Sequence, residues 1–96
     1  MILHDKPRPA GFRRFELTSH LMSDVIGPEG TNELDAFARR IGLKVEWRQK
    51  SGTETEHYDL FDGAIERAVA AGSVEVRGVD LITRCVRPKR AARETA

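Results

Sequence analysis

The fold is decided by residues 31–47, which read TNELDAFARRIGLKVEW. In the first part, apolar residues recur at the three- and four-residue spacing of a helix, at Leu34, Phe37, Ala38 and Ile41. A cap from Thr31 or Asn32 would begin this helix, and Gly42 would end it. In the second part, apolar and charged residues alternate from Leu43 to Trp47. This alternation predicts a strand with one buried face.

The helical spacing and the two-residue alternation of strands recur along the rest of the chain. Strands are expected at residues 1–4, 15–22, 43–47 and 74–76, and helices at 31–42, 62–72 and 79–86. Pro7 and Pro9 predict an irregular, extended loop between the first two strands. Short strand–helix–strand steps favour crossovers between parallel strands. The sequence therefore predicts a small single α/β domain with three helices and a mixed, largely parallel sheet of about four strands.

The composition is that of one small globular domain in a reducing compartment. Of the 96 residues, 40% are hydrophobic and 32% are charged, and Cys85 has no partner for an internal disulfide. No apolar run approaches the roughly 20 residues that cross a bilayer. The first seven residues are too few and too polar for a signal peptide. We therefore expect a cytoplasmic protein with no membrane partner.

Charge is distributed unevenly along the chain. The net charge is +1, but residues 87–96 alone carry +3, from four bases and one acid. We assign the α/β domain to residues 1–86 and expect residues 87–96 to form a disordered basic tail with at most weak contact with nucleic acid. The slightly acidic remainder lacks the basic face of a strong DNA-binding protein.

The most distinctive polar stretch is Glu56-His57-Tyr58-Asp59-Leu60, between a polar loop and a helix. If this stretch is extended, His57 and Asp59 lie on one face, where the carboxylate can orient the imidazole as a base, a metal ligand or a phosphate contact. The alternative is that Asp59 caps the helix and His57 packs against Tyr58. His20, at the end of the second strand, is either part of the same site or a surface histidine.

Two other pairs could contact a ligand. Trp47 and Gln49 lie at the end of the expected third strand, where an indole can stack on a base and an amide can read its edge. The alternation also suits Trp47 as a core residue. Arg13 and Arg14 could bind phosphate, or lie on the surface. No Gly-rich phosphate loop, Cys-x-x-Cys pair or nucleophile elbow is present, so we expect neither a cofactor nor covalent catalysis.

These stretches also resemble a known family. The chain is similar to the domain of unknown function 4031 family, small proteins of bacteria and their phages whose hallmark is His-Tyr-Asp-Leu, here residues 57–60. Matching pieces include SHLMSD at residues 19–24, ELDAFARRIG at 33–42 and WRQ at 47–49. Where the family usually has two acidic residues, this chain has His4-Asp5. The resemblance implies that His20, His57 and Asp59 share one site, and it implies no activity.

Three functions fit these residues, and we rank them in the order given. The first is a non-catalytic, homodimeric binding protein for a phosphorylated small molecule such as a nucleotide or nucleotide-derived signal; a phage could use it to sequester a host defence signal. Its ligand contacts, without metal, would be Arg13, Arg14, His20, Trp47, Gln49, His57, Tyr58 and Asp59. The second is a metal-dependent hydrolase or nuclease with the ligands Asp5, His20, His57 and Asp59. The third is a protein or nucleic-acid interaction module that uses the basic tail.

Overall fold

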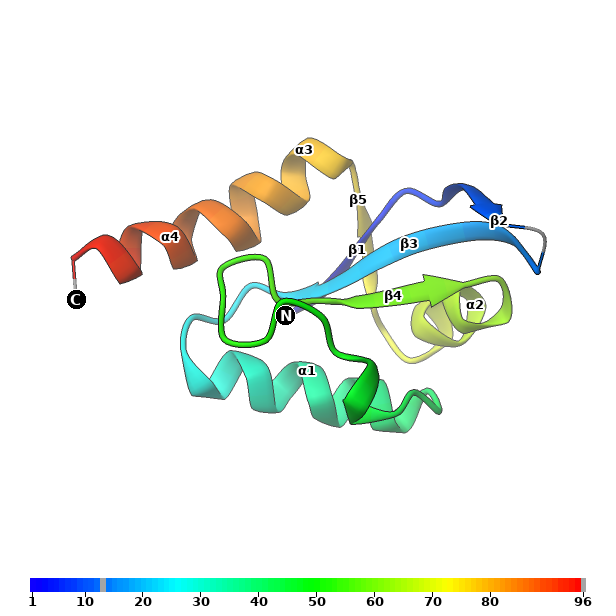
Figure 1. Ribbon diagram of the computed structural model, residues 1–96, viewed down its shortest axis with the longest axis horizontal. Coiled ribbons are helices and arrows are strands. Elements are labelled where there is room, and N and C mark those ends of the chain that lie inside the picture. The colour runs from blue at the N-terminus through cyan, green and yellow to red at the C-terminus, as the bar shows by residue number, and fades with distance from the viewer. Residues whose placement is uncertain (13, 96) are drawn as a thin grey trace.

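The sheet is built around one long strand, β3. The computed structural model describes residues 1–12 and 14–95, and its strands are β1 (Ile2–Asp5), β2 (Arg8–Phe12), β3 (Phe15–Ser23), β4 (Tyr58–Phe61) and β5 (Val74–Val76). Thr18 of β3 pairs with Arg8 of β2 on one side and with Phe61 of β4 on the other. Leu21 likewise lies between β1 and β4. Strands β1 and β2 therefore follow one edge of β3, β4 follows the other, and β5 pairs with β1 (Figure 1).

The mixed α/β architecture is confirmed, but the prediction of a largely parallel sheet is wrong. The pairs β1–β3, β2–β3 and β3–β4 are antiparallel, and within the described residues only β1 and β5 run parallel. One reason is that residues 8–12 form a strand where we expected a loop. Pro9 is tolerated there because β2 is an edge strand, where a missing N–H can face solvent.

Residues 43–47 do not form the predicted third strand. They contain a 3-10 turn, η1 (Val45–Trp47). Leu43 is buried in the main core, whereas Val45 is only partly buried and Trp47 is 52% exposed. The segment meets the sheet two residues later, where Gln49 forms an isolated bridge with His57. A five-residue alternation therefore belongs here to a turn that packs one side chain into the core.

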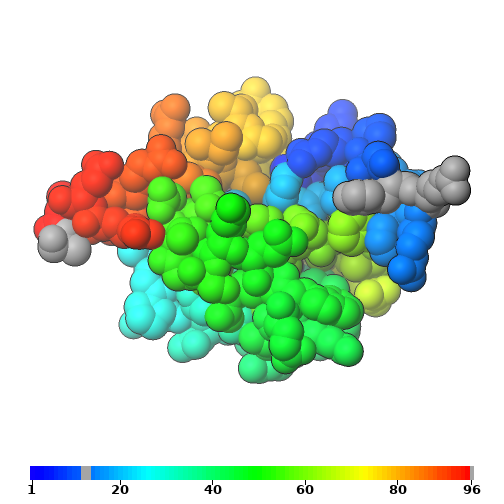
Figure 2. All heavy atoms as spheres, viewed as in Figure 1, coloured from blue at the N-terminus to red at the C-terminus, as the bar shows by residue number. Residues whose placement is uncertain are grey.

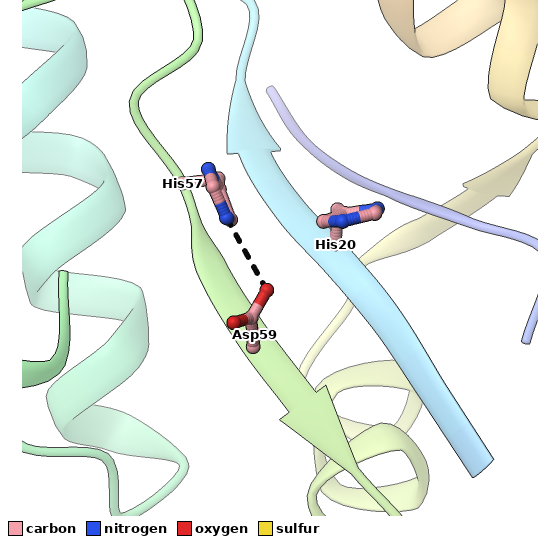
Figure 3. A group of neighbouring side chains, drawn as sticks. All are labelled: His20, His57 and Asp59. Carbon is pink, nitrogen blue, oxygen red and sulfur yellow. Dashed lines mark ion pairs between the residues drawn. The ribbon is translucent and has the colours of Figure 1, made fainter. Parts of the chain in front are cut away.

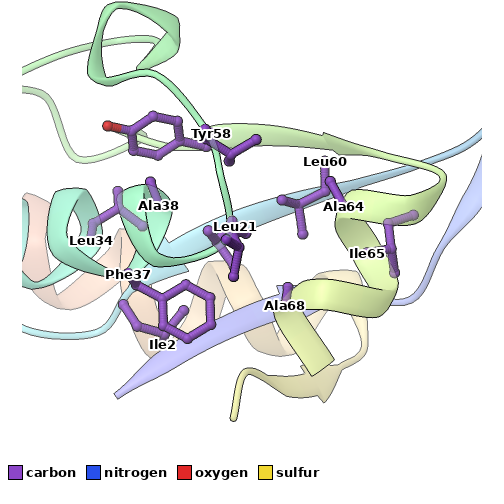
Figure 4. Close-up of a cluster of buried hydrophobic side chains, with 12 residues drawn as sticks. Ile2, Leu21, Leu34, Phe37, Ala38, Tyr58, Leu60, Ala64, Ile65 and Ala68 are labelled. Atoms are coloured by element: carbon purple, nitrogen blue, oxygen red, sulfur yellow. The ribbon is translucent and has the colours of Figure 1, made fainter. Parts of the chain in front are cut away.

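Helices α1 (Pro28–Arg40) and α2 (Gly63–Ala70) pack on one face of the sheet. Helix α1 begins about one turn before the expected caps, because Gly27 adopts a φ of 85° and Pro28 occupies the first turn. The predicted apolar stripe of this helix is confirmed as core. Figure 4 shows this cluster, whose members include Leu21, Leu34, Phe37, Ala38, Tyr58, Leu60 and Ala68.

The C-terminal helical segment covers part of the opposite face. It consists of α3 (Gly78–Leu81), a π-helical turn η2 (Ile82–Val86) and α4 (Arg87–Glu94), which follow one another without a break. Leu81, Cys85 and Val86 form a second core cluster with Leu3 of β1 and Met22 of β3. The sheet therefore has helices on both faces, and among the described residues the second cluster contacts β1, the end of β3 and, through Val76, β5.

Residues 87–94 are helical, whereas we expected a disordered tail. Pro88 lies in the first turn of α4, directly after the wide π-helical turn, where its missing N–H and its ring are tolerated. Arg90 and Arg93 pair with Glu54, at 3.4 and 3.2 Å, in the loop that precedes β4. Figure 2 shows α4 (red) beside this loop (green). Within the described residues, no helix is long and apolar enough to cross a membrane.

Candidate functional site

Strands β1 and β3 each present a polar residue on the face that carries the C-terminal helix. Leu3 and Met22 point to that helix. Because side chains alternate along a strand, Asp5, two residues after Leu3, and His20, two residues before Met22, emerge on the same face. They lie beyond the apolar cluster under the helix, and the His20 side chain is 33% exposed.

Strand β4 adds the second histidine and a second carboxylate. Tyr58 and Leu60 point into the core under α1, so His57 and Asp59 point to the opposite face. Asp59 is the direct antiparallel partner of His20. Figure 3 shows His57 and Asp59 in front of β4 and His20 in front of the adjacent β3. The sequence-based expectation that His57 and Asp59 share an extended face agrees with this arrangement.

The ring of His20 is held by Asp5. His20 Nδ1 lies 2.9 Å from Asp5 Oδ2, and the other carboxylate oxygen accepts hydrogen bonds from the His20 N–H at 2.6 Å and the Ser19 hydroxyl at 2.9 Å. Burial alone would raise the pKa of Asp5, but these hydrogen bonds lower it to about 2. Asp5 is therefore an ionised acceptor near neutral pH, and Nδ1 of His20 must be the donor.

The ring of His57 is held at both nitrogens. Its Nδ1 lies 2.7 Å from the Thr55 carbonyl oxygen, which can only accept, and its Nε2 lies 3.2 Å from Asp59 Oδ1. The bond to Asp59 is the main cause of a raised pKa of His57; burial opposes it and the Thr55 carbonyl adds to it. The other oxygen of Asp59 accepts a hydrogen bond from the Gln49 amide at 2.5 Å. Gln49 therefore fixes the carboxylate from the side away from His57.

His20, His57 and Asp59, which we call the HHD cluster, lie close enough together that they could hold a metal ion. One ligand atom from each lies within 4.8 Å of the other two, and the imidazole centroids are 5.2 Å apart at an interplanar angle of 79°. Metal-bound histidines usually donate their second ring nitrogen to a carboxylate or a backbone carbonyl. Asp5 does this for His20, and the Thr55 carbonyl does it for His57. Asp5 thus hydrogen-bonds to His20 and is not one of the three residues of the HHD cluster.

Arg8 also reaches this site, and the sequence did not indicate it. Its guanidinium nitrogens lie 3.3 Å from Asp5 Oδ2 and 3.4 Å from His20 Nε2, and the residue is 53% exposed. Arg8 lies between Pro7 and Pro9, and two prolines at this spacing predict a loop rather than a strand. Only the pairing of β2 beside β1 along β3 brings its side chain to His20.

Tyr58, one of the predicted ligand contacts, lies on the wrong face of the sheet for that role. It is fully buried, and its hydroxyl donates a hydrogen bond to Asp35 Oδ1 at 2.6 Å. Arg48 also binds Asp35, and it lies near Glu56. Tyr58 therefore belongs to a polar network between α1 and the loop before β4.

The remaining predicted contacts are only partly brought together. Trp47 is exposed rather than part of the core, and it lines a groove that also includes Gln49 and Asp59. Arg14 is exposed, with its guanidinium 5.8 Å from the centroid of the Phe15 ring. Six residues of extended chain separate it from His20, about 20 Å. Arg13 lies outside the described residues.

The comparisons with known proteins give one match. Neither the curated proteins nor the solved structures contain a match to this chain. A family model described as "Protein of unknown function (DUF4031)" matches residues 2–88, which include β1 to β5 and every member of the HHD cluster. The chain therefore belongs to the DUF4031 family.

Proposed function

We propose that the protein is a metal-dependent hydrolase of phosphate esters, with the HHD cluster as its metal site. The observation that carries this proposal is the orientation of the two imidazoles. Both use Nδ1 to donate to an oxygen acceptor, so the neutral form of each ring keeps its lone pair on Nε2. Two such nitrogens beside one carboxylate oxygen form a donor set that suits Zn²⁺ and related divalent transition metals.

The distances between the ligand atoms of the cluster suit a bound metal after small side-chain movements. Tetrahedral zinc bonds of about 2.0–2.2 Å place ligand atoms roughly 3.5 Å apart. Ligand atoms within 4.8 Å of one another reach that spacing with side-chain shifts of about 1 Å. Three protein ligands leave a fourth position for water, which is the pattern of a catalytic rather than a structural zinc site.

The surroundings of the cluster favour an anionic substrate. The exposed guanidinium of Arg8 lies beside His20 and can pair with a phosphate oxygen. A bound metal would lower the pKa of its water. The water oxygen would then form a bond to phosphorus, the ester P–O bond would break, and the departing oxygen would take up the proton that the water lost, relayed by solvent. Arg8 would stabilise the negative charge of the phosphoryl group during this transfer.

The test is hydrolysis of bis(4-nitrophenyl) phosphate by protein supplied with Zn²⁺ or Mn²⁺. We expect turnover that a chelator abolishes and that His57→Ala and Asp59→Asn each reduce at least about 100-fold. Asp80→Asn is the matched control, because Asp80 is a carboxylate that pairs with Arg77 away from the cluster. Absence of turnover with either metal, or equal activity in His57→Ala, contradicts the proposal.

A second candidate is the non-catalytic binding of a phosphorylated molecule. Arg8 favours it independently of a metal, since an exposed guanidinium with a buried carboxylate behind it is positioned to bind phosphate. The two candidates differ in their response to a chelator. Binding of inorganic phosphate that persists in a chelator and is weakened by Arg8→Ala, without ester hydrolysis, would favour this candidate.

A further inference from the structure

A groove with a volume of about 560 Å³ adjoins the HHD cluster. Its lining includes Phe15, Leu43, Trp47, Gln49, Asp59 and Phe61. Asp59 belongs to both features, because one of its oxygens faces His57 and the other accepts from Gln49. Only the Asp59 side chain therefore separates a molecule bound at the cluster from the groove.

The walls of the groove suit a flat aromatic group. Phe15 and Phe61 stack on each other, with ring centroids 4.4 Å apart and planes at 21°. Trp47 is 52% exposed although it is the largest apolar side chain of the domain, and the Lys44 amine lies 5.7 Å from its ring centroid. An exposed indole costs hydrophobic free energy, which a stacked ligand would recover.

Polar groups in the groove can orient such a ring through hydrogen bonds. The Gln49 amide nitrogen is fixed by Asp59, which leaves its carbonyl oxygen able to accept from a base amino or imino group. Arg67 also lines the groove, and its Nε is held by the Ile41 carbonyl at 2.9 Å. Apolar walls with a few positioned polar groups are typical of small-molecule sites.

We infer that this groove binds a nucleobase, so that the substrates of the HHD cluster are nucleotides. The inference rests on the proposed function for the place of the phosphate, and on the groove itself for the base. The base would stack against Trp47 and bind Gln49, while its phosphate lies at the metal and Arg8. Sugar phosphates, which lack a base, would contact only the metal and Arg8 and would leave the groove empty.

The experiment compares adenosine monophosphate with ribose 5-phosphate, with and without Zn²⁺. Trp47 is the only tryptophan of the chain, so its fluorescence reports on the groove directly. We expect the nucleotide to quench this fluorescence and to bind at least about fivefold more tightly than the sugar phosphate, as base stacking predicts. Calorimetry should show that Trp47→Ala removes this preference. Val79→Ala, which shortens an exposed apolar side chain on α3, should leave this preference unchanged.

The two proposals fail in different ways. If the groove binds bases but the cluster holds no metal, the nucleotide still quenches Trp47 in a chelator and the preference survives. If the cluster binds metal but the groove does not bind bases, both ligands bind equally in Zn²⁺ and Trp47 fluorescence does not respond. Equal affinities for the nucleotide and the sugar phosphate overturn the inference. So does a preference for nucleotides that persists in Trp47→Ala with all four of adenosine, cytidine, guanosine and uridine monophosphate.

Discussion

Nδ1 of His20 donates a hydrogen bond to Oδ2 of Asp5, 2.9 Å away, and Asp5 is itself 4% exposed. Asp5 is the last residue of β1, and His20 lies on the neighbouring strand β3. A buried carboxylate thus sets the tautomer of a partly exposed imidazole. In metal sites, this arrangement directs the other ring nitrogen to the ion.

We expect Asp5→Asn to weaken Zn²⁺ binding about 10–100-fold without unfolding the protein. Two donors, the His20 N–H and the Ser19 hydroxyl, hold the Oδ1 position and would keep the amide oxygen there. The amide nitrogen would then face His20 Nδ1 and move the ring proton to Nε2. Competition with a chromogenic chelator measures the affinity, and Asp80→Asn serves as the control. Unchanged affinity in Asp5→Asn would show that Asp5 does not orient His20 for a metal.

Tyr58→Phe should affect stability and leave metal binding intact. Tyr58 is buried and its hydroxyl binds Asp35, on the face away from the HHD cluster. Loss of this hydrogen bond should lower the free energy of unfolding by about 1–2 kcal/mol, as measured by urea denaturation. If instead zinc affinity falls while the unfolding free energy stays constant, Tyr58 acts in the site and our assignment of the two faces is wrong.

Asp35 should make stability depend on acidity. Burial would raise the pKa of this carboxyl, but hydrogen bonds from Arg48 and Tyr58 outweigh it and hold the pKa below the ordinary value. A group whose folded-state pKa is lowered stabilises the protein above the unfolded-state pKa, near 4, and loses that contribution as the pH falls through the folded-state pKa. The unfolding free energy of the wild type, measured in a chelator, should therefore exceed that of Asp35→Asn at pH 7. The difference should shrink below about pH 4; a constant difference would contradict this.

Removal of residues 90–96 should lower Tm by less than about 5 °C, because exposed ion pairs contribute little. No residue of α4 is buried, and its contacts to Glu54 are pairs between partly exposed side chains. Removal of residues 85–96 is the control, since it takes away the buried Cys85 and Val86 and should unfold the domain or lower Tm far more. A drop beyond 10 °C for the shorter deletion would show that α4 stabilises the body substantially.

The local patterns of the sequence predicted local structure well. The spacing of Leu34, Phe37 and Ala38 placed the first helix on the core, and each is buried. The period of two also placed His57 and Asp59 on one face, because alternation depends only on the strand itself. Helix α1 nevertheless begins earlier than its side-chain caps suggested, since a glycine and a proline start it.

Features that depend on distant pairing could not be predicted. The contact of Arg8 with His20 requires that β2 follow β1 along the same edge of β3, which no local pattern contains. The five-residue alternation ending at Trp47 is equally compatible with a strand and a turn. Only the packing of the whole domain decides that Leu43 is buried and Trp47 exposed.

The most direct test of the HHD cluster is the zinc content of the protein after equilibrium dialysis against Zn²⁺, measured by elemental analysis. We expect about one ion per chain in the wild type and a loss of most of it in His20→Ala, His57→Ala and Asp59→Asn, each shown to be folded by circular dichroism. Asp80→Asn should retain the ion, since Asp80 pairs with Arg77 outside the cluster. A wild-type protein that binds no more zinc than folded His57→Ala would show that the HHD cluster is not a metal site.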